Sequence, residues 1–212
     1  YGYFNPIAKS AIFAPYDFIA DIFRGFKGIS FDIRRRPQEV IDACEACIPL
    51  QTKIGITSKP TPMSECYIPL HMAGYMKTKD FEKFYWPSFE KTIRTVAATG
   101  QGISLFNEND WSRYLDHLAD LPEGIRMRFE YGDPKEFKKK LGKKHILSGF
   151  YPLSLLTGGS VNENIETLKE MLDILAPGGN YVFDVDKVMA TYDGGKENYI
   201  AVLNYIRDNT NY

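Results

Sequence analysis

The sequence lacks several features that would place it in a special class of protein. It has no run of about 18 apolar residues, so no membrane-spanning helix is expected. It has almost no excess of either charge, with a formal net charge of -1 at pH 7, so a nucleic-acid partner is not expected. It has three cysteines, an odd number that does not suit a disulfide framework and favours a cytoplasmic location.

The first residues also lack the features of a signal peptide. Tyr1 to Pro6 contains neither a basic segment nor an apolar one. Tyr1 is not an initiator residue. We therefore expect the chain to start within a larger unit or to have been processed.

What the sequence does contain is an alternation of short apolar runs and amphipathic helices. The clearest helix begins at Ser160, where Glu163 completes a capping box. Its apolar residues follow one helical stripe and are Val161, Ile165, Leu168, Leu172 and Leu175. Pro177-Gly178-Gly179 is expected to end this helix.

Further helices are expected on both sides of this one. A long helix covers roughly Asp80 to Ala98, and Pro87 should kink it. A shorter helix begins with Asp133 as its N-cap and stops near Gly142. Two more are expected at Glu39–Cys47 and around Ile200, Leu203 and Ile206.

Six apolar runs between these helices predict β-strands. They are Ala11–Ala14, Tyr67–His71, Gly102–Asn107, Ile125–Glu130, His145–Phe150 and Tyr181–Asp186. Strands that alternate with helices favour a parallel sheet covered by helices, and a closed parallel barrel has eight strands. We therefore expect an α/β fold, a (β/α)8 TIM barrel that is incomplete in this chain, with residues 1–212 as its single domain. Because an open arc of strands exposes its edges, the missing units should come from an N-terminal fragment, a partner chain or a second copy.

Several short stretches follow one another in a recognisable order along nearly the whole chain. They are Ala14-Pro15-Tyr16, Arg24-Gly25, Leu70 to Gly74, Phe81 to Pro87, Leu141-Gly142, Ser148-Gly149 with Pro152 and Leu155-Leu156, Ala176 to Gly179, and Glu197-Asn198. Taken together they resemble the uroporphyrinogen decarboxylase superfamily, which includes porphyrinogen decarboxylases and cobalamin- or corrinoid-linked methyltransferases. The resemblance implies that the chain covers about strands 3 to 8 of the barrel.

The positions that carry the chemistry of the decarboxylases hold other residues here. By the resemblance, their substrate-contacting tyrosine corresponds to Asp21, and their serine after the fourth strand to His71. Their histidine after the last strand corresponds to Lys187, and their catalytic aspartate belongs to the part that this chain lacks. The resemblance therefore implies a divergent member of the superfamily, for which the classical decarboxylation is not expected.

The zinc-dependent methyltransferase branch is matched no better. Its ligand positions correspond to Leu105, Asn107 and a position near Asp186, none of which supplies a thiolate. The function that the resemblance implies is methyl transfer linked to a corrinoid, cobalamin or thiol acceptor. The alternatives are decarboxylation of a porphyrinogen-like tetrapyrrole acid and a non-catalytic binding subunit of a corrinoid enzyme complex. The expected partners are a small-molecule or tetrapyrrole substrate and a corrinoid protein, and the expected cofactor is a corrinoid or a metal ion, without a complete metal motif in this chain.

Polar residues gather at the carboxyl ends of the predicted strands, where barrels of this kind place their active sites. The candidate catalytic residues are His71, Glu108, Glu130 and Asp184, and the candidate substrate-binding residues are Asp21, Asn107, Arg128, Asp186 and Lys187. The alternative for any of these residues is a role in capping helices or binding loop backbone. We expect that role for Asp133, which also lies at this end of the strands.

The predicted strand Ile125–Glu130 alternates strictly between apolar and charged residues, unlike a strand that is buried on both faces. Either Arg126 and Arg128 share the face that lines the barrel, or this strand is less buried than a central strand should be. We expect Arg126 to form a structural ion pair with a carboxylate such as Glu108. Arg128, nearer the strand end, is the better candidate for holding an anionic substrate.

Asp184 and Asp186 should point to the same face of the last predicted strand. Paired carboxylates there could share a proton, bind a cation or orient Lys187. The simpler alternative is that Lys187 neutralises them at the barrel rim.

Cys44 and Cys47 are three residues apart on an expected helix, where such thiols usually pack in the core. With Cys66 and His71 they would complete a four-ligand zinc set. We disfavour that set because Cys66 and His71 lie at opposite ends of one strand.

Overall fold

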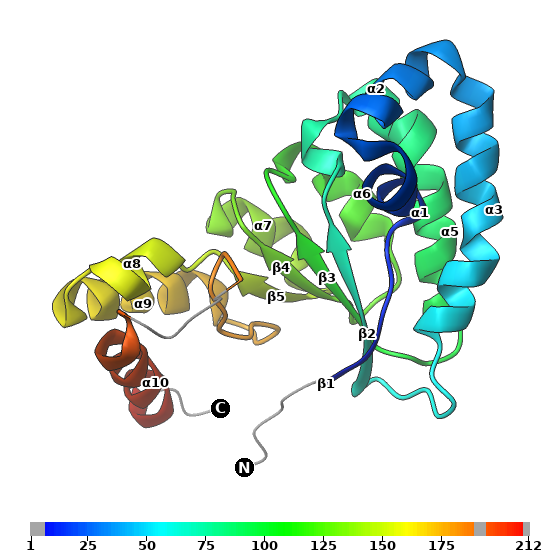
Figure 1. The fold of residues 1–212 in the computed structure, drawn as a ribbon. Coiled ribbons are helices and arrows are strands. Elements are labelled where there is room, and N and C mark those ends of the chain that lie inside the picture. The colour runs from blue at the N-terminus through cyan, green and yellow to red at the C-terminus, as the bar shows by residue number, and fades with distance from the viewer. Residues whose placement is uncertain (1–6, 189–193, 210–212) are drawn as a thin grey trace.

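The computed structural model describes residues 7–188 and 194–209. A five-stranded, all-parallel sheet lies at its centre, with its strands side by side in chain order (Figure 1). The strands are β1 (Ile7–Ala11), β2 (Ser64–Leu70), β3 (Ile103–Asn107), β4 (Arg126–Phe129) and β5 (Ile146–Gly149). The predicted α/β class and parallel sheet are therefore confirmed, and among the described residues the sheet is open, with β1 and β5 as its outer strands.

Helices connect the strands and continue beyond the sheet (Figure 1). The α-helices are α1 (Pro15–Phe18), α2 (Gly25–Arg35), α3 (Pro37–Gly55), α4 (Thr78–Asp80), α5 (Trp86–Ala97), α6 (Leu115–Asp120), α7 (Pro134–Leu141), α8 (Leu153–Gly158), α9 (Val161–Leu175) and α10 (Lys196–Asn209). Two π-helical segments, η1 (Ile19–Arg24) and η3 (Phe81–Tyr85), and two 3-10 segments, η2 (Ala73–Tyr75) and η4 (Ser112–Tyr114), join them. Within the described ranges, none of these helices combines the length and apolar character needed to cross a membrane.

The two faces of the sheet have different surroundings. One face carries Ile68, Leu105 and Met127, which are fully buried in one apolar cluster with residues of α3, α5 and α7. On the opposite face Tyr67 and Arg128 are only half-buried. The alternating burial of β4 follows the predicted pattern and directs both of its arginines to this second face.

Two strand predictions need correction. The first strand lies at Ile7–Ala11 instead of Ala11–Ala14, because Pro15 already occupies the first turn of α1. The predicted last strand makes only two isolated parallel bridges, from Tyr181 to Leu147 and from Val185 to Tyr151. Val182 N and Asp186 N donate backbone hydrogen bonds to the carbonyls of Leu147 and Tyr151, and the Val185 carbonyl accepts a hydrogen bond from the Arg128 side chain.

The helix predictions hold, with one refinement. Ser160 and Glu163 form the expected capping box, and the Asp133 side chain accepts a hydrogen bond from Lys135 N at 3.0 Å. The kink expected at Pro87 is a change from the π-helical η3 to a new α-helix, with Pro87 in its first turn. The core prediction for Cys44 also holds, since its thiol is free and buried on α3, and burial raises its pKa to about 12.

Candidate functional site

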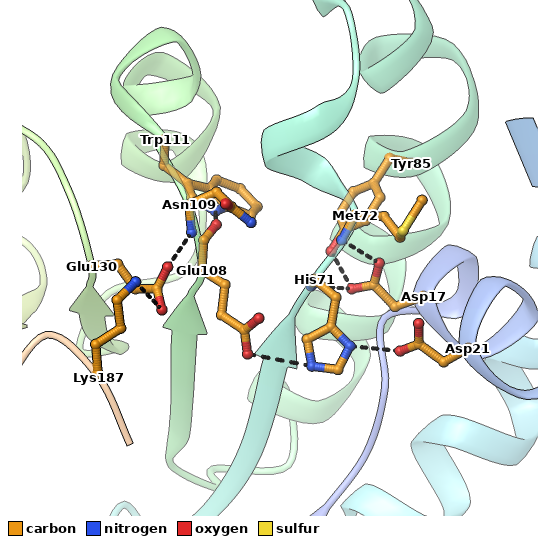
Figure 2. A network of polar contacts seen from close by, with 10 residues as sticks. All are labelled: Asp17, Asp21, His71, Met72, Tyr85, Glu108, Asn109, Trp111, Glu130 and Lys187. Carbon is orange, nitrogen blue, oxygen red and sulfur yellow. Dashed lines mark hydrogen bonds and ion pairs between the residues drawn. The ribbon is translucent and has the colours of Figure 1, made fainter. Parts of the chain in front are cut away.

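His71 follows directly after β2 and lies between two carboxylates (Figure 2). Its Nδ1 is 2.6 Å from Oδ2 of Asp21, which η1 supplies, and its Nε2 is 3.4 Å from Oε1 of Glu108, which follows β3. The three side chains are about one-third exposed, at 32%, 31% and 30%. The imidazole is therefore held at both nitrogens and can still be reached by a small molecule.

The charges around His71 alter its protonation. Burial alone would lower the pKa of His71, but the hydrogen bond to Asp21 and the charges of Glu108 and Asp17 raise it above 6.5. Burial and the neighbouring charge of Glu130 raise the pKa of Glu108. These contacts therefore favour the protonated form of the imidazole, which can act as an acid.

Asp17, in α1, is a member of this network that sequence reasoning did not find. It is fully buried, and its carboxylate accepts hydrogen bonds from the backbone N–H groups of His71 and Met72 at 3.1 and 3.0 Å. The Tyr85 hydroxyl donates a third hydrogen bond at 2.7 Å (Figure 2). The sequence feature that could have identified Asp17 is that it is the one acidic residue in the otherwise apolar stretch from Ile12 to Ala20.

Glu130 and Lys187 extend the network on the other side. One oxygen of Glu130 accepts a hydrogen bond from Asn109 N at 2.7 Å, and the other lies 2.8 Å from Lys187 Nζ (Figure 2). Asn109 directly follows Glu108 and has a φ of 63°. Glu130 therefore fixes the loop that carries Glu108, and the structure brings five of the nine candidate residues together: Asp21, His71, Glu108, Glu130 and Lys187.

Arg128 and Asp184 contact the C-terminal segment. Arg128 donates hydrogen bonds to the carbonyls of Val185, at 2.8 Å, and of Lys187. Its Nη1 lies 3.5 Å from Asp184, and its guanidinium covers the Phe106 ring at 4.5 Å from the centroid. The guanidinium therefore already binds groups of the chain itself, so Arg128 is a weaker candidate for binding a substrate.

Asp186 and Asn107 have structural contacts. Asp186 accepts a hydrogen bond from Leu153 N at 2.8 Å, at the start of α8, and within the described residues no hydrogen bond or ion pair joins it to Asp184. Asn107 is buried and donates to the Arg128 carbonyl at 3.0 Å. These are the helix-capping and backbone-binding roles that we had considered as the alternative.

The structural ion pair expected for Arg126 is confirmed, but Glu108, the carboxylate given as an example, is not its partner. Arg126 pairs with Glu65 on β2, through contacts of 2.6 and 3.1 Å. The strand register explains this choice, because Arg126 is level with Ser104 and Glu108 lies four residues further along, about 13 Å away. The residues in the described ranges also contain no group of three side chains that could hold a metal ion, so the zinc set of three cysteines and His71 is not formed.

Comparisons with known proteins indicate the fold but no family. No protein-family model matches the chain, and no curated protein matches it. Among solved structures, a methyltransferase from Methanosarcina mazei is similar, with a TM-score of 0.60 and 16% sequence identity. The match covers 93% of this chain and 57% of that one, so the chain spans little more than half the length of this structural neighbour. At this identity the likeness shows a shared fold, and the superfamily assignment stays a prediction.

Proposed function

We propose that the chain is part of a methyltransferase in which His71 acts as the general acid. The observation that carries this proposal is the position of the imidazole between Asp21 and Glu108, beyond the carboxyl end of β2. The fold shared with a methyltransferase supports it. We further infer that the open sheet belongs to a (β/α)8 barrel of the uroporphyrinogen decarboxylase type, with its missing units supplied by an N-terminal fragment, a partner chain or a second copy.

In the proposed reaction, His71 protonates the group that the methyl carbon leaves. The bond from carbon to the leaving atom breaks with its electron pair on that atom, which takes the imidazole proton. The acceptor supplies the electron pair of the new bond to carbon. Asp21 orients the ring through Nδ1, so Nε2 on the Glu108 side is the nitrogen that faces the substrate.

The acceptor is a second substrate, either a thiol or a corrinoid carried by a partner protein. A corrinoid would supply a strongly nucleophilic centre for the methyl group. A resident zinc ion does not fit the described residues, because they offer no set of three metal ligands. We therefore assign to this chain the proton transfer and the orientation of the methyl donor.

Methyl transfer can be tested with methylcobalamin and 2-mercaptoethanol as probes, by following loss of the methylcobalamin absorbance. In this direction neutral His71 accepts the thiol proton. We expect the protein to accelerate the reaction and the His71→Gln variant to lose roughly 100- to 10,000-fold of that acceleration. His117→Gln is the matched control, because His117 is a partly exposed histidine on α6 that pairs with Glu82 at 3.7 Å.

Three results would overturn the proposal. The first is no acceleration by the unmodified protein, or an equal loss in both histidine variants. The second is release of carbon dioxide from uroporphyrinogen, which would favour decarboxylation. The third is that His71→Ala and Glu130→Ala leave every measured activity intact, which would favour a non-catalytic subunit.

A further inference from the structure

Asp17 is a buried carboxylate whose three hydrogen bonds all come from neutral donors. Two of these donors are the consecutive amides of His71 and Met72, at the point where β2 has ended. The parallel pairing with β3 stops at Leu70, so the sheet ladder no longer holds the peptide that carries the His71 side chain. Asp17 supplies the hydrogen bonds that the ladder does not.

The helical stretch that carries Asp17 also contacts the imidazole ring of His71. Asp17 in α1 and Asp21 in η1 are four residues apart and therefore lie on one face of the stretch, about one turn apart. Asp17 binds the backbone of His71, and Asp21 binds Nδ1 of its imidazole. One helix face thus fixes both the main chain and the side chain of this residue.

Tyr85 supports Asp17 from a third element. It lies in η3, is fully buried, and stacks on Phe81 with ring centroids 5.4 Å apart. Its hydroxyl and the His71 amide both donate to Oδ2 of Asp17. A buried carboxylate that loses one such donor is left with an unmet acceptor. The Tyr85 hydrogen bond also lowers the pKa of Asp17, so without it the carboxyl is protonated more readily and is a weaker acceptor for the two amides.

We propose that Asp17 is a positioning residue that fixes the His71 imidazole between Asp21 and Glu108, with the Tyr85 hydroxyl as its support. The inference rests on the proposed role of His71, because it explains how that side chain is kept in place. Asp17 itself is enclosed and does not touch the substrate.

The inference can be tested by NMR on the whole chain, with readouts that need no activity. The sequence has three histidines, so the C2–H signal of His71 can be assigned with the His71→Gln and His117→Gln variants and then titrated. Amide hydrogen exchange at His71 and Met72 reports directly on the two backbone hydrogen bonds. The variants are Asp17→Asn, which keeps the shape but makes one oxygen an amino group, and Tyr85→Phe, which removes only the hydroxyl.

The matched control is Tyr151→Phe. Tyr151 is also fully buried, but it belongs to a separate apolar cluster and its hydroxyl donates to Asn164. We expect Asp17→Asn to speed exchange at the two amides about tenfold or more and to lower the pKa of His71 by about half a unit. Tyr85→Phe should change both in the same direction by a smaller amount, and Tyr151→Phe should change neither.

Unchanged exchange and an unchanged His71 titration in Asp17→Asn would overturn the inference. If Asp17→Asn does not fold, Tyr85→Phe decides alone, and an effect no larger than that of Tyr151→Phe overturns it. The proposed function fails separately, if His71→Gln keeps full methyl-transfer activity while the NMR changes occur as expected.

Discussion

The ion pair between Glu65 and Arg126 allows a quantitative prediction of how much stability the chain loses when the pair is broken. The pair is bidentate and bridges β2 and β4, with side-chain exposures of 5% and 17%. Glu65→Gln removes the charge and leaves the guanidinium without its carboxylate in a largely enclosed place. Breaking one partner of a buried pair costs about 3–5 kcal/mol, and the residual exposure of Arg126 places our expectation near 3 kcal/mol.

Urea unfolding at pH 7 measures this cost, and a double-mutant cycle separates the pair from its surroundings. Arg126→Met should cost a similar amount, whereas the Glu65→Met/Arg126→Met double variant should lose less than the sum, because no charge is left unpaired. Glu39→Gln is the control, since it breaks an exposed pair with Arg36 of side-chain exposures 69% and 65% and should change stability little. A Glu65→Gln variant as stable as Glu39→Gln would refute the view that this pair lies in an enclosed interior.

Two further substitutions test local features. Gly149→Ala should destabilise the chain by several kcal/mol in the same urea assay, because Gly149 has a φ of +87° and an added Cβ would lie 2.3 Å from the Phe129 carbonyl oxygen. Gly158→Ala, which has open space around its Cβ, is the control. Burial raises the pKa of Asp17 from 3.8 to about 7, so its contribution to stability is fully present below pH 3.8 and is lost as the pH rises through 7. The stability of the unmodified chain relative to Asp17→Asn should therefore fall by up to about 4 kcal/mol between pH 4 and pH 8, and a difference that does not change with pH would contradict this.

The sequence predicted the residues at the strand ends better than it predicted their partners. His71, Glu108 and Glu130 each follow a strand, and parallel strands bring their carboxyl ends to one edge of the sheet. That rule needs only the order of the strands. The contacts of these three residues depend on register and on helices that are far away in the sequence. Asp17, for example, lies 54 residues from the His71 amide that it binds.

The two failures at the sheet have the same physical origin. Alternation along β4 identified the face on which Arg126 lies, but it did not identify the partner. Carboxylates were available from Glu65 on β2, on the far side of β3, and from Glu108 after β3, and register selected Glu65. Residues Tyr181–Asp186 have the composition of a strand, yet Arg128 binds the carbonyl of Val185 with its side chain. The segment keeps backbone hydrogen bonds only at isolated points, and a side-chain donor to one of its carbonyls leaves no periodic pattern in the sequence.

The charge balance of the site distinguishes between the chemistries that we considered. The network contains four carboxylates and two groups that can be cationic, namely Asp17, Asp21, Glu108, Glu130, His71 and Lys187. Lys187 is paired with Glu130, and Arg128 is occupied by the C-terminal carbonyls, so neither cation is free to bind a polycarboxylate. A porphyrinogen acid would bring further negative charge against Asp21 and Glu108, and that repulsion opposes binding. A neutral methyl donor would meet no such repulsion, and the hydrogen bond and charges of these carboxylates raise the pKa of the imidazole, which suits the acid role proposed for His71. The surroundings of His71 therefore favour an acid that acts on an uncharged substrate.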